Sequence, residues 1–162
     1  MSVDQRLDEA QLRRTFGAFP SGVTAVAAIV DGLPVGLAAS SFTSVSLDPP
    51  MVSVSVAHRS RTWPRLRTVQ RLGVSVLGAH QEDAARQLAD RDNDRFAAID
   101  WRATPDGAIV LVGNSAWFDC SIDKEVAAGD HDLVLLRVHA LGSDAAIPPL
   151  VFHASQFRRL EI

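Results

Sequence analysis

The chain is poor in the residues from which several common kinds of site are built. It has no tyrosine, and among its 162 residues Cys120 is the single cysteine. One cysteine excludes an internal disulfide and a thiolate-rich metal cluster. Because Cys120 alternates with Phe118 and Ile122 in an apolar segment, we expect it to lie in the core and not to act as a nucleophile.

Long apolar runs and a surplus of positive charge are also lacking. No stretch stays apolar for the roughly 20 residues that a membrane span requires. Residues 1–14 are charged and do not resemble a secretory signal, so we expect a cytoplasmic protein that binds no membrane. A formal net charge of −3 argues against nucleic acid as a partner.

The motifs of common nucleotide, hydrolase and zinc sites are missing. The chain contains no G-x-G-x-x-G and no G-x-x-x-x-G-K-[ST], which argues against a Rossmann or P-loop site. It contains no G-x-S-x-G, which leaves a hydrolase without its nucleophile. The five histidines include no H-x-x-x-H pair, and His131 and His139 would stand about 25 Å apart on one extended strand. We therefore expect no metal site.

The patterning that is present predicts a β-rich domain. Helices are predicted from Asp8, with Leu12 and Phe16 on one face, and over residues 81–89, while residues 90–105 look irregular. Many short strands with two helices indicate one domain over residues 1–162, folded as a closed or nearly closed antiparallel barrel. The β-branched runs that predict strands cover residues 23–30, 35–46, 52–56, 72–77, 109–112, 115–123, 133–141 and 157–160.

Small hydroxyl residues gather in two segments beside predicted strand ends, residues 39–44 and 58–63. Hydroxyls and free backbone N–H groups can bind phosphate without a P-loop, and Arg59 or Arg61 can add charge-assisted hydrogen bonds. Serine and threonine are also common at turns and on solvent-exposed faces, and composition alone favours that interpretation.

Two further segments place imidazoles near strand ends. His131 follows the predicted turn at Gly129-Asp130, and an imidazole at the end of a strand stands where ligands often bind. Phe152 and His153 follow a pair of prolines and are candidates for the same opening. The alternatives are a surface histidine at a turn and a phenylalanine packed in the core.

In this order, these segments resemble the flavin reductase family with the FMN-binding split-barrel fold, whose members supply reduced flavin to two-component monooxygenases. The resemblance runs from about residue 16 to residue 160. It implies a mainly β fold, an antiparallel FMN-binding split β-barrel with a few peripheral helices. The segments that carry it are residues 19–24, 36–42, 44–50, 60–62, 129–131 and 149–153.

In this family the flavin lies in a groove at a homodimer interface. The resemblance implies that Ala39, Ser40 and Ser41 line this groove. It also implies that Ser46 and Leu47 lie against the isoalloxazine ring.

The resemblance assigns the remaining positions to the phosphate, the nicotinamide and an aromatic pair. It places Arg59, Ser60 and Thr62 at the flavin phosphate, and His131 on the nicotinamide side. The pair Phe152-His153 matches a pair that is often Tyr-His in members of the family, and this chain has no phenolic hydroxyl at that position.

The implied activity is that of an NAD(P)H:flavin oxidoreductase. Hydride would pass from NADH or NADPH to FMN or FAD, and the reduced flavin would go to a partner monooxygenase. This transfer requires closely stacked rings more than an acid or a base, so His131 is expected to position the nicotinamide. No basic patch for the 2′-phosphate of NADPH is evident in the sequence, which favours NADH.

Two other functions fit the same residues. A flavin-binding split-barrel carrier or sensor would bind flavin without turnover of NADH or NADPH. A small β-barrel interaction module would bind no flavin, and added flavin would leave its thermal stability unchanged.

Overall fold

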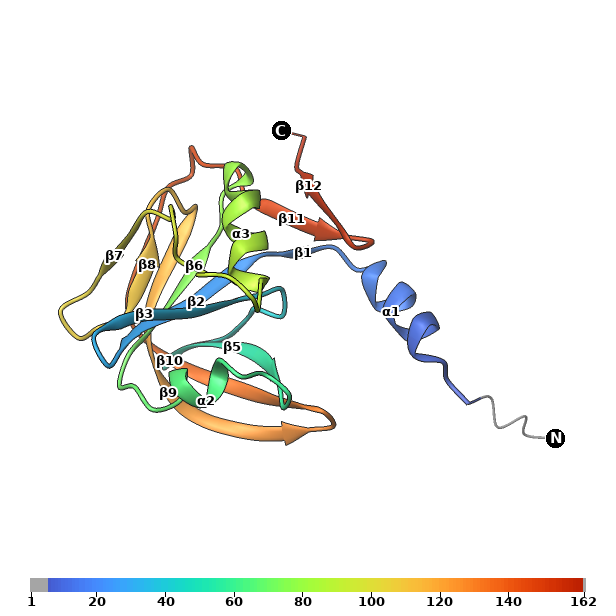
Figure 1. Cartoon of the computed structure of the whole chain (residues 1–162), viewed down its shortest axis with the longest axis horizontal. Helices are drawn as coiled ribbons and strands as arrows, with labels where there is room; N and C mark the ends of the chain where they lie inside the picture. Colours follow the sequence, from blue (N-terminus) through green and yellow to red (C-terminus); the bar gives the residue numbers. More distant parts are fainter. Residues whose placement is uncertain (1–5, 162) are drawn as a thin grey trace.

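Runs rich in β-branched residues fold about half of this chain into antiparallel strands, as a computed structural model of residues 6–161 shows (Figure 1). In chain order the elements are α1 (Glu9–Gly17), β1 (Ser21–Gly22), β2 (Thr24–Val30), β3 (Leu33–Ala39), β4 (Thr43–Leu47), β5 (Pro50–Ala57), α2 (Trp63–Leu66), β6 (Leu72–Val76), the 3₁₀ turn η1 (Ala79–Gln81), α3 (Glu82–Ala89), β7 (Trp101–Ala103), β8 (Ile109–Leu111), β9 (Ala116–Ala128), β10 (His131–Ser143), β11 (Leu150–His153) and β12 (Gln156–Arg159).

The main sheet has seven strands in the order β3-β2-β6-β9-β10-β5-β4. Val26 and Val35, from one end of this order, share a buried cluster with Val54 and Val134 from the other end. The sheet therefore curls around its own core as a barrel. The two outermost strands, β3 and β4, are not hydrogen-bonded to each other, so the barrel is split. The predicted split-barrel class is confirmed.

A second core lies on the outer face of β2 and β6. Leu88 of α3 packs there with Ile109 of β8 and Leu150 of β11. Strand β2 is thus covered on both faces, which explains why its sequence is apolar almost without a break. Cys120 is fully buried, as expected. Burial, followed by the charge of Asp119, raises the pKa of its thiol to about 12.

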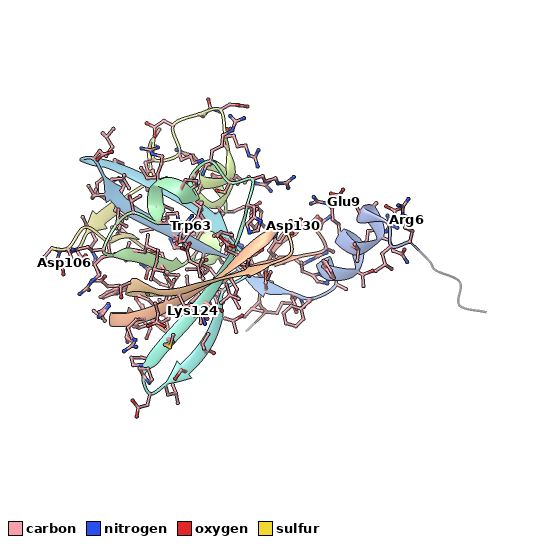
Figure 2. The ribbon with its side chains drawn as sticks, turned by 90° about the horizontal axis from the view of Figure 1, so that it is seen from below. Arg6, Glu9, Trp63, Asp106, Lys124 and Asp130 are labelled. Atoms are coloured by element: carbon pink, nitrogen blue, oxygen red, sulfur yellow. The ribbon has the colours of Figure 1, made fainter. Side chains whose placement is uncertain are left out.

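The first helix leaves the body of the barrel (Figures 1 and 2). As predicted, it begins after Asp8, whose carboxylate caps it by accepting from the N–H of Ala10. None of its residues is buried, and Phe16 and Phe19 are 71% and 78% exposed. No helix within residues 6–161 has the length and apolar character needed to cross a bilayer.

Several predicted elements differ from the observed ones. The predicted strand over residues 35–46 is two strands, β3 and β4, because the chain leaves its pairing with β2 at Ser40 and turns to pair with β5. The sequence interpretation missed α2, although Pro64 in its first turn is a typical helix-start signal. It also missed β7 inside the segment expected to be irregular, and it missed β11.

Gly73 marks the closest approach between the main sheet and β8. A Cβ on this residue would overlap the carbonyl oxygen of Ile109. We expect Gly73→Ala to destabilise the fold by about 3 kcal/mol, the upper end of the usual cost of overpacking, measured by urea denaturation. Gly22→Ala is the matched control, because no heavy atom lies within 4 Å of its added methyl group. Equal stability of the two variants would contradict this account.

Candidate functional site

A pocket of about 690 Å³ opens at the split in the barrel, within the range of small-molecule sites. One wall is β3, and the opposite wall is the end of β5 together with residues 59–62, which lead into α2, and Arg65 of α2. The end of α3 and residues 91–96 form a third side, and His131 of β10 also lines the pocket.

The pocket exists because the second half of β5 has no strand beside it on this side. Strand β4 pairs with residues 50–53 of β5 only. Beyond that point the hydroxyl of Ser41 accepts from the backbone N–H of Ser55 at 2.9 Å and donates to its carbonyl at 3.1 Å. The Ser41 side chain therefore makes the two backbone hydrogen bonds at Ser55 that a neighbouring strand would otherwise make. Ser41 lines the pocket as predicted, but its hydrogen bonds go to β5.

The predicted phosphate-binding segment is held by the start of α2. The hydroxyl oxygen of Ser60 accepts from the backbone N–H of Trp63 at 3.1 Å. The Trp63 side chain is buried, and its ring N–H donates to Glu125 at 2.9 Å. Because Ser60 uses its oxygen as an acceptor, its O–H remains free to donate to a ligand in the pocket.

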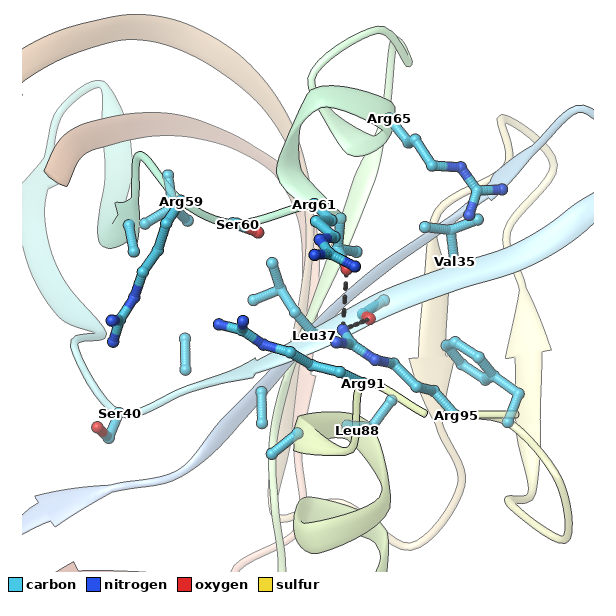
Figure 3. Close-up of a pocket in the computed structure, with 18 of the residues that line it drawn as sticks. Val35, Leu37, Ser40, Arg59, Ser60, Arg61, Arg65, Leu88, Arg91 and Arg95 are labelled. Carbon is cyan, nitrogen blue, oxygen red and sulfur yellow. Dashed lines mark hydrogen bonds between the residues drawn. The ribbon is translucent and has the colours of Figure 1, made fainter. Parts of the chain in front are cut away.

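Five arginines line this pocket: Arg59, Arg61, Arg65, Arg91 and Arg95 (Figure 3). Within residues 6–161, none of the five forms an ion pair, whereas five arginines outside the pocket do. Asp94 is the one carboxylate on the described lining, and it accepts from the N–H of Phe96. The guanidinium groups of the pocket therefore form no direct ion pairs, and the nearby charges of Asp90 and Asp130 offset only part of their positive charge.

Arg95 is the most firmly held of the five. Its guanidinium donates to the Thr62 hydroxyl at 2.9 Å and to the carbonyls of Gly36 and Asp90 at 3.0 and 2.9 Å. Burial, and then the positive charge of Arg91, lower its pKa. A guanidinium that is half-buried among neutral acceptors and beside a like charge is suited to receiving an anion.

His131 reaches the pocket from the first residue of β10. Its Nδ1 lies 2.7 Å from a carboxylate oxygen of Asp130. That hydrogen bond, together with the charges of His131 and Arg59, lowers the pKa of Asp130. Asp130 orients the ring through Nδ1, which leaves Nε2 as the nitrogen that can meet a ligand.

The pocket brings together seven of the eleven predicted site residues. They are Ala39, Ser40, Ser41, Arg59, Ser60, Thr62 and His131.

The other four predicted residues do not line this pocket within the described chain. Ser46 and Leu47 lie on β4, and Leu47 is 97% exposed. Phe152 lines an adjoining hollow with Phe157, whose ring centroid lies 5.3 Å from its own, and this hollow shares Ala38–Ser40 with the pocket. His153 lines neither space.

Sequence reasoning named Arg59 and Arg61 and missed the other three of the five arginines. Arg91 and Arg95 belong to the segment interpreted as irregular, and Arg65 to a helix that was not predicted. The distance of Arg91 and Arg95 along the chain from Arg59 and Arg61 hides the cluster, which forms only when residues 91–95 fold over β3. The net charge of −3 averages over the whole surface and conceals it further.

A family model and the similar proteins of known sequence indicate the same family. A family model described as flavin reductase like domain matches residues 16–161. The reductase subunit HsaB of a flavin-dependent monooxygenase from Rhodococcus jostii is 35% identical over 157 residues, which are 97% of this chain and 80% of that protein. The stachydrine N-demethylase reductase subunit Stc3 from Rhizobium meliloti is 41% identical over 84% of this chain. The chain spans 43% and 60% of the length of two relatives from that organism.

A solved structure shares the fold over almost the whole chain. It is the NADH:FAD oxidoreductase SgcE6 from Streptomyces globisporus, in complex with NAD and FAD fragments, at a TM-score of 0.89 and 39% sequence identity. The likeness covers 95% of this chain and 93% of that one.

The unpaired guanidinium groups predict that simple anions stabilise the protein. At about ten times its dissociation constant, an anion adds about 1.4 kcal/mol of stability, or roughly 3–6 °C in Tm for a domain of this size. Phosphate should therefore raise the Tm above that in chloride at equal ionic strength. The effect should disappear in Arg95→Gln and persist in Arg67→Gln, whose guanidinium pairs with Glu125 outside the pocket. An equal effect of both anions on wild type would contradict an anion site.

Proposed function

Because the chain belongs to the flavin reductase family, we propose that it transfers hydride from NADH or NADPH to FMN or FAD bound in the arginine-lined pocket. The reduced flavin then passes to a partner monooxygenase. The observation that carries the proposal is that the predicted hydroxyls and His131 meet in one pocket at the split, beside guanidinium groups without ion pairs. Relatives named as reductase subunits of monooxygenases support the partner class.

The chain's residues fit a phosphorylated flavin. The free O–H of Ser60, the hydroxyl of Thr62 and the guanidinium of Arg95 stand together and offer the donors that a phosphate requires. Ala39 and Ser40 line the pocket with small side chains, so a flat ring can approach their backbone closely. A bound flavin supplies the hydride acceptor, so the protein's tasks are to hold the two rings together, to limit access of water and to let the product leave.

A flavin carrier or sensor is the second candidate. The observation in its favour is that, within the described lining, no carboxylate or imidazole other than Asp94 and His131 is available for proton transfer. Hydride transfer itself needs none, so the same lining suits the reductase.

Steady-state oxidation of NADH and NADPH with riboflavin, FMN and FAD separates these functions. A reductase consumes the reduced nicotinamide only when a flavin is supplied. Flavin binding without turnover would leave the carrier, and absence of binding to any of the three flavins would reject both.

His131→Ala tests the nicotinamide side. We expect kcat/KM for NADH to fall about tenfold to a hundredfold, or roughly 1.4–2.7 kcal/mol, while flavin affinity stays nearly unchanged. The pH profile should be shallow, because the protein removes no proton in the hydride transfer. The lowered pKa of Asp130 also keeps its carboxylate ionised at every pH above the ordinary pKa of an aspartate. Stopped-flow reduction of flavin at several NADH concentrations is the measurement. Unchanged rates and NADH affinity would make His131 a turn residue only.

We also propose that the protein is a homodimer that covers the exposed apolar residues of α1, of the turn after it and of β4. Phe16, Phe19 and Leu47 are each more than 70% exposed, and Val45 is 48% exposed. Burial of a side chain of this size stabilises an association by about 1.5–3 kcal/mol, so leaving four of them in water is costly. The family resemblance supports the proposal, because it implies a flavin groove at such an interface, where Ser46 and Leu47 would reach the flavin.

Light scattering at micromolar concentration tests the dimer. Wild type should have twice the chain mass, and Leu47→Asp should shift the equilibrium toward monomer because a charge would be buried at the interface. Asp106→Asn serves as the control, because Asp106 lies on an exposed turn outside the pocket. A monomeric wild type with full reductase activity would overturn this proposal.

A further inference from the structure

Glu125 of β9 binds both ends of the short helix α2. One of its carboxylate oxygens accepts from the ring N–H of Trp63 at 2.9 Å, and the other accepts from the Arg67 guanidinium at 2.7 Å. Trp63 is the first residue of α2, and Arg67 is the residue that follows its last turn. A single carboxylate from a distant strand therefore holds this helix against the barrel.

Helix α2 needs such an anchor because it has little stability of its own. It contains four residues, and isolated helices shorter than about 12–15 residues are marginal in water. Thr62 stands at its N-cap, but within residues 6–161 its side chain makes no capping hydrogen bond. The Thr62 hydroxyl accepts instead from Arg95 at 2.9 Å. The position of α2 is therefore set by its contacts with the rest of the fold.

Burial of apolar side chains does not by itself fix the orientation of α2. Trp63 and Leu66 lie in the barrel core with Val134. Apolar packing of this kind is non-directional, whereas a hydrogen bond prefers one geometry. Glu125 is the register partner of Val134, so it projects from the same face of the sheet and meets the ring N–H of Trp63 there. This bond fixes the direction in which the indole ring points.

The orientation of Trp63 determines where the predicted phosphate-binding residues lie. Its backbone N–H donates to the Ser60 hydroxyl at 3.1 Å, and Thr62 directly precedes it in the chain. A shift of Trp63 would therefore displace both hydroxyls from the pocket wall. The negative charge of Glu125 does not oppose an anion there, because Arg67 pairs with it outside the pocket.

We infer that Glu125 is a positioning residue for the anion site: acting through the Trp63 ring, it holds Ser60 and Thr62 where they can donate to a phosphate. The inference rests on the proposed function, in which that phosphate belongs to the flavin. Arg67 is not part of this route, because its side chain is 49% exposed and an exposed ion pair contributes little.

Affinities for FMN and for riboflavin, measured by fluorescence titration, test the route. Riboflavin has no phosphate, so the ratio of the two affinities isolates the phosphate contacts. We expect Glu125→Ala to weaken FMN about tenfold and riboflavin less than about twofold. Trp63→Phe keeps the packing of the ring but removes its N–H, so it should give the same result, and it decides the matter if Glu125→Ala does not fold.

Two variants serve as matched controls. Glu125→Gln keeps an acceptor for the Trp63 ring N–H, so it should restore the affinity for FMN to within about twofold of wild type. Arg67→Gln removes the other partner of Glu125 and should also stay within about twofold, because the bond to Trp63 remains.

Two further measurements separate positioning from a general loss of structure. In Glu125→Ala, KM for FMN should rise about tenfold while kcat at saturating FMN stays within about twofold, since a phosphate contact does not change the hydride-transfer barrier. The double variant Glu125→Ala/Trp63→Phe should weaken FMN no more than either single change, because both act through one hydrogen bond.

Three results would overturn the inference: equal weakening of FMN and riboflavin in Glu125→Ala and Trp63→Phe, unchanged FMN affinity in both, or an equal loss in Arg67→Gln. Failure of the proposed function is distinguishable, because wild type would then bind neither flavin. The rise of Tm in phosphate would still report on the two hydroxyls. It should be lost in Glu125→Ala and kept in Arg67→Gln, and its persistence in Glu125→Ala would also overturn the inference.

Discussion

The incomplete pairing of β5 is the constraint on which the rest of the structure depends. A backbone polar group left unpaired away from water costs as much as a lost hydrogen bond, so an open strand needs other partners. Ser41 provides them at Ser55, and the carbonyl of Ala57 accepts from the N–H of Ser60. The barrel can therefore stay open between β3 and β5, and the turn that satisfies the end of β5 is the same turn that carries Ser60 and Thr62.

The charge of the pocket follows from this opening. Buried arginines usually need carboxylates, but the arginines of an open groove can remain solvated until an anion arrives. Arg95 stays in place without a carboxylate because two carbonyls and a hydroxyl satisfy its guanidinium. The folded state thus accepts repulsion between Arg91 and Arg95, which binding of an anion relieves. Such an exchange of stability for function is common at binding sites.

Much of the fold was predictable, because it depends on local patterns. Alternation at residues 52–56 and the apolar run of β2 identify strands, and Asp8 identifies the start of α1. The site was predictable where one segment carries it, as at Ser60 and Thr62. Arg91 and Arg95 were not, since nothing in residues 90–105 indicates that this segment folds against β3. Leu47 shows a further limit: its place on β4 follows from pairing, but nothing within residues 6–161 that lies over it explains why an exposed position holds a leucine.

Under the proposed function, the lining residues divide the work between affinity and rate. A phosphate group keeps its charge when the ring it is attached to is reduced, so contacts of Thr62 and Arg95 with that phosphate would stabilise the bound ground state and the transition state equally. Such uniform binding sets how long a flavin stays, and it leaves the hydride-transfer barrier unchanged. His131 lines the pocket from β10, at the far side of β5 from β4, and contacts there can differ between ground state and transition state. A reductase that must release its product requires this separation, because the arginines can then be tuned for release without loss of rate.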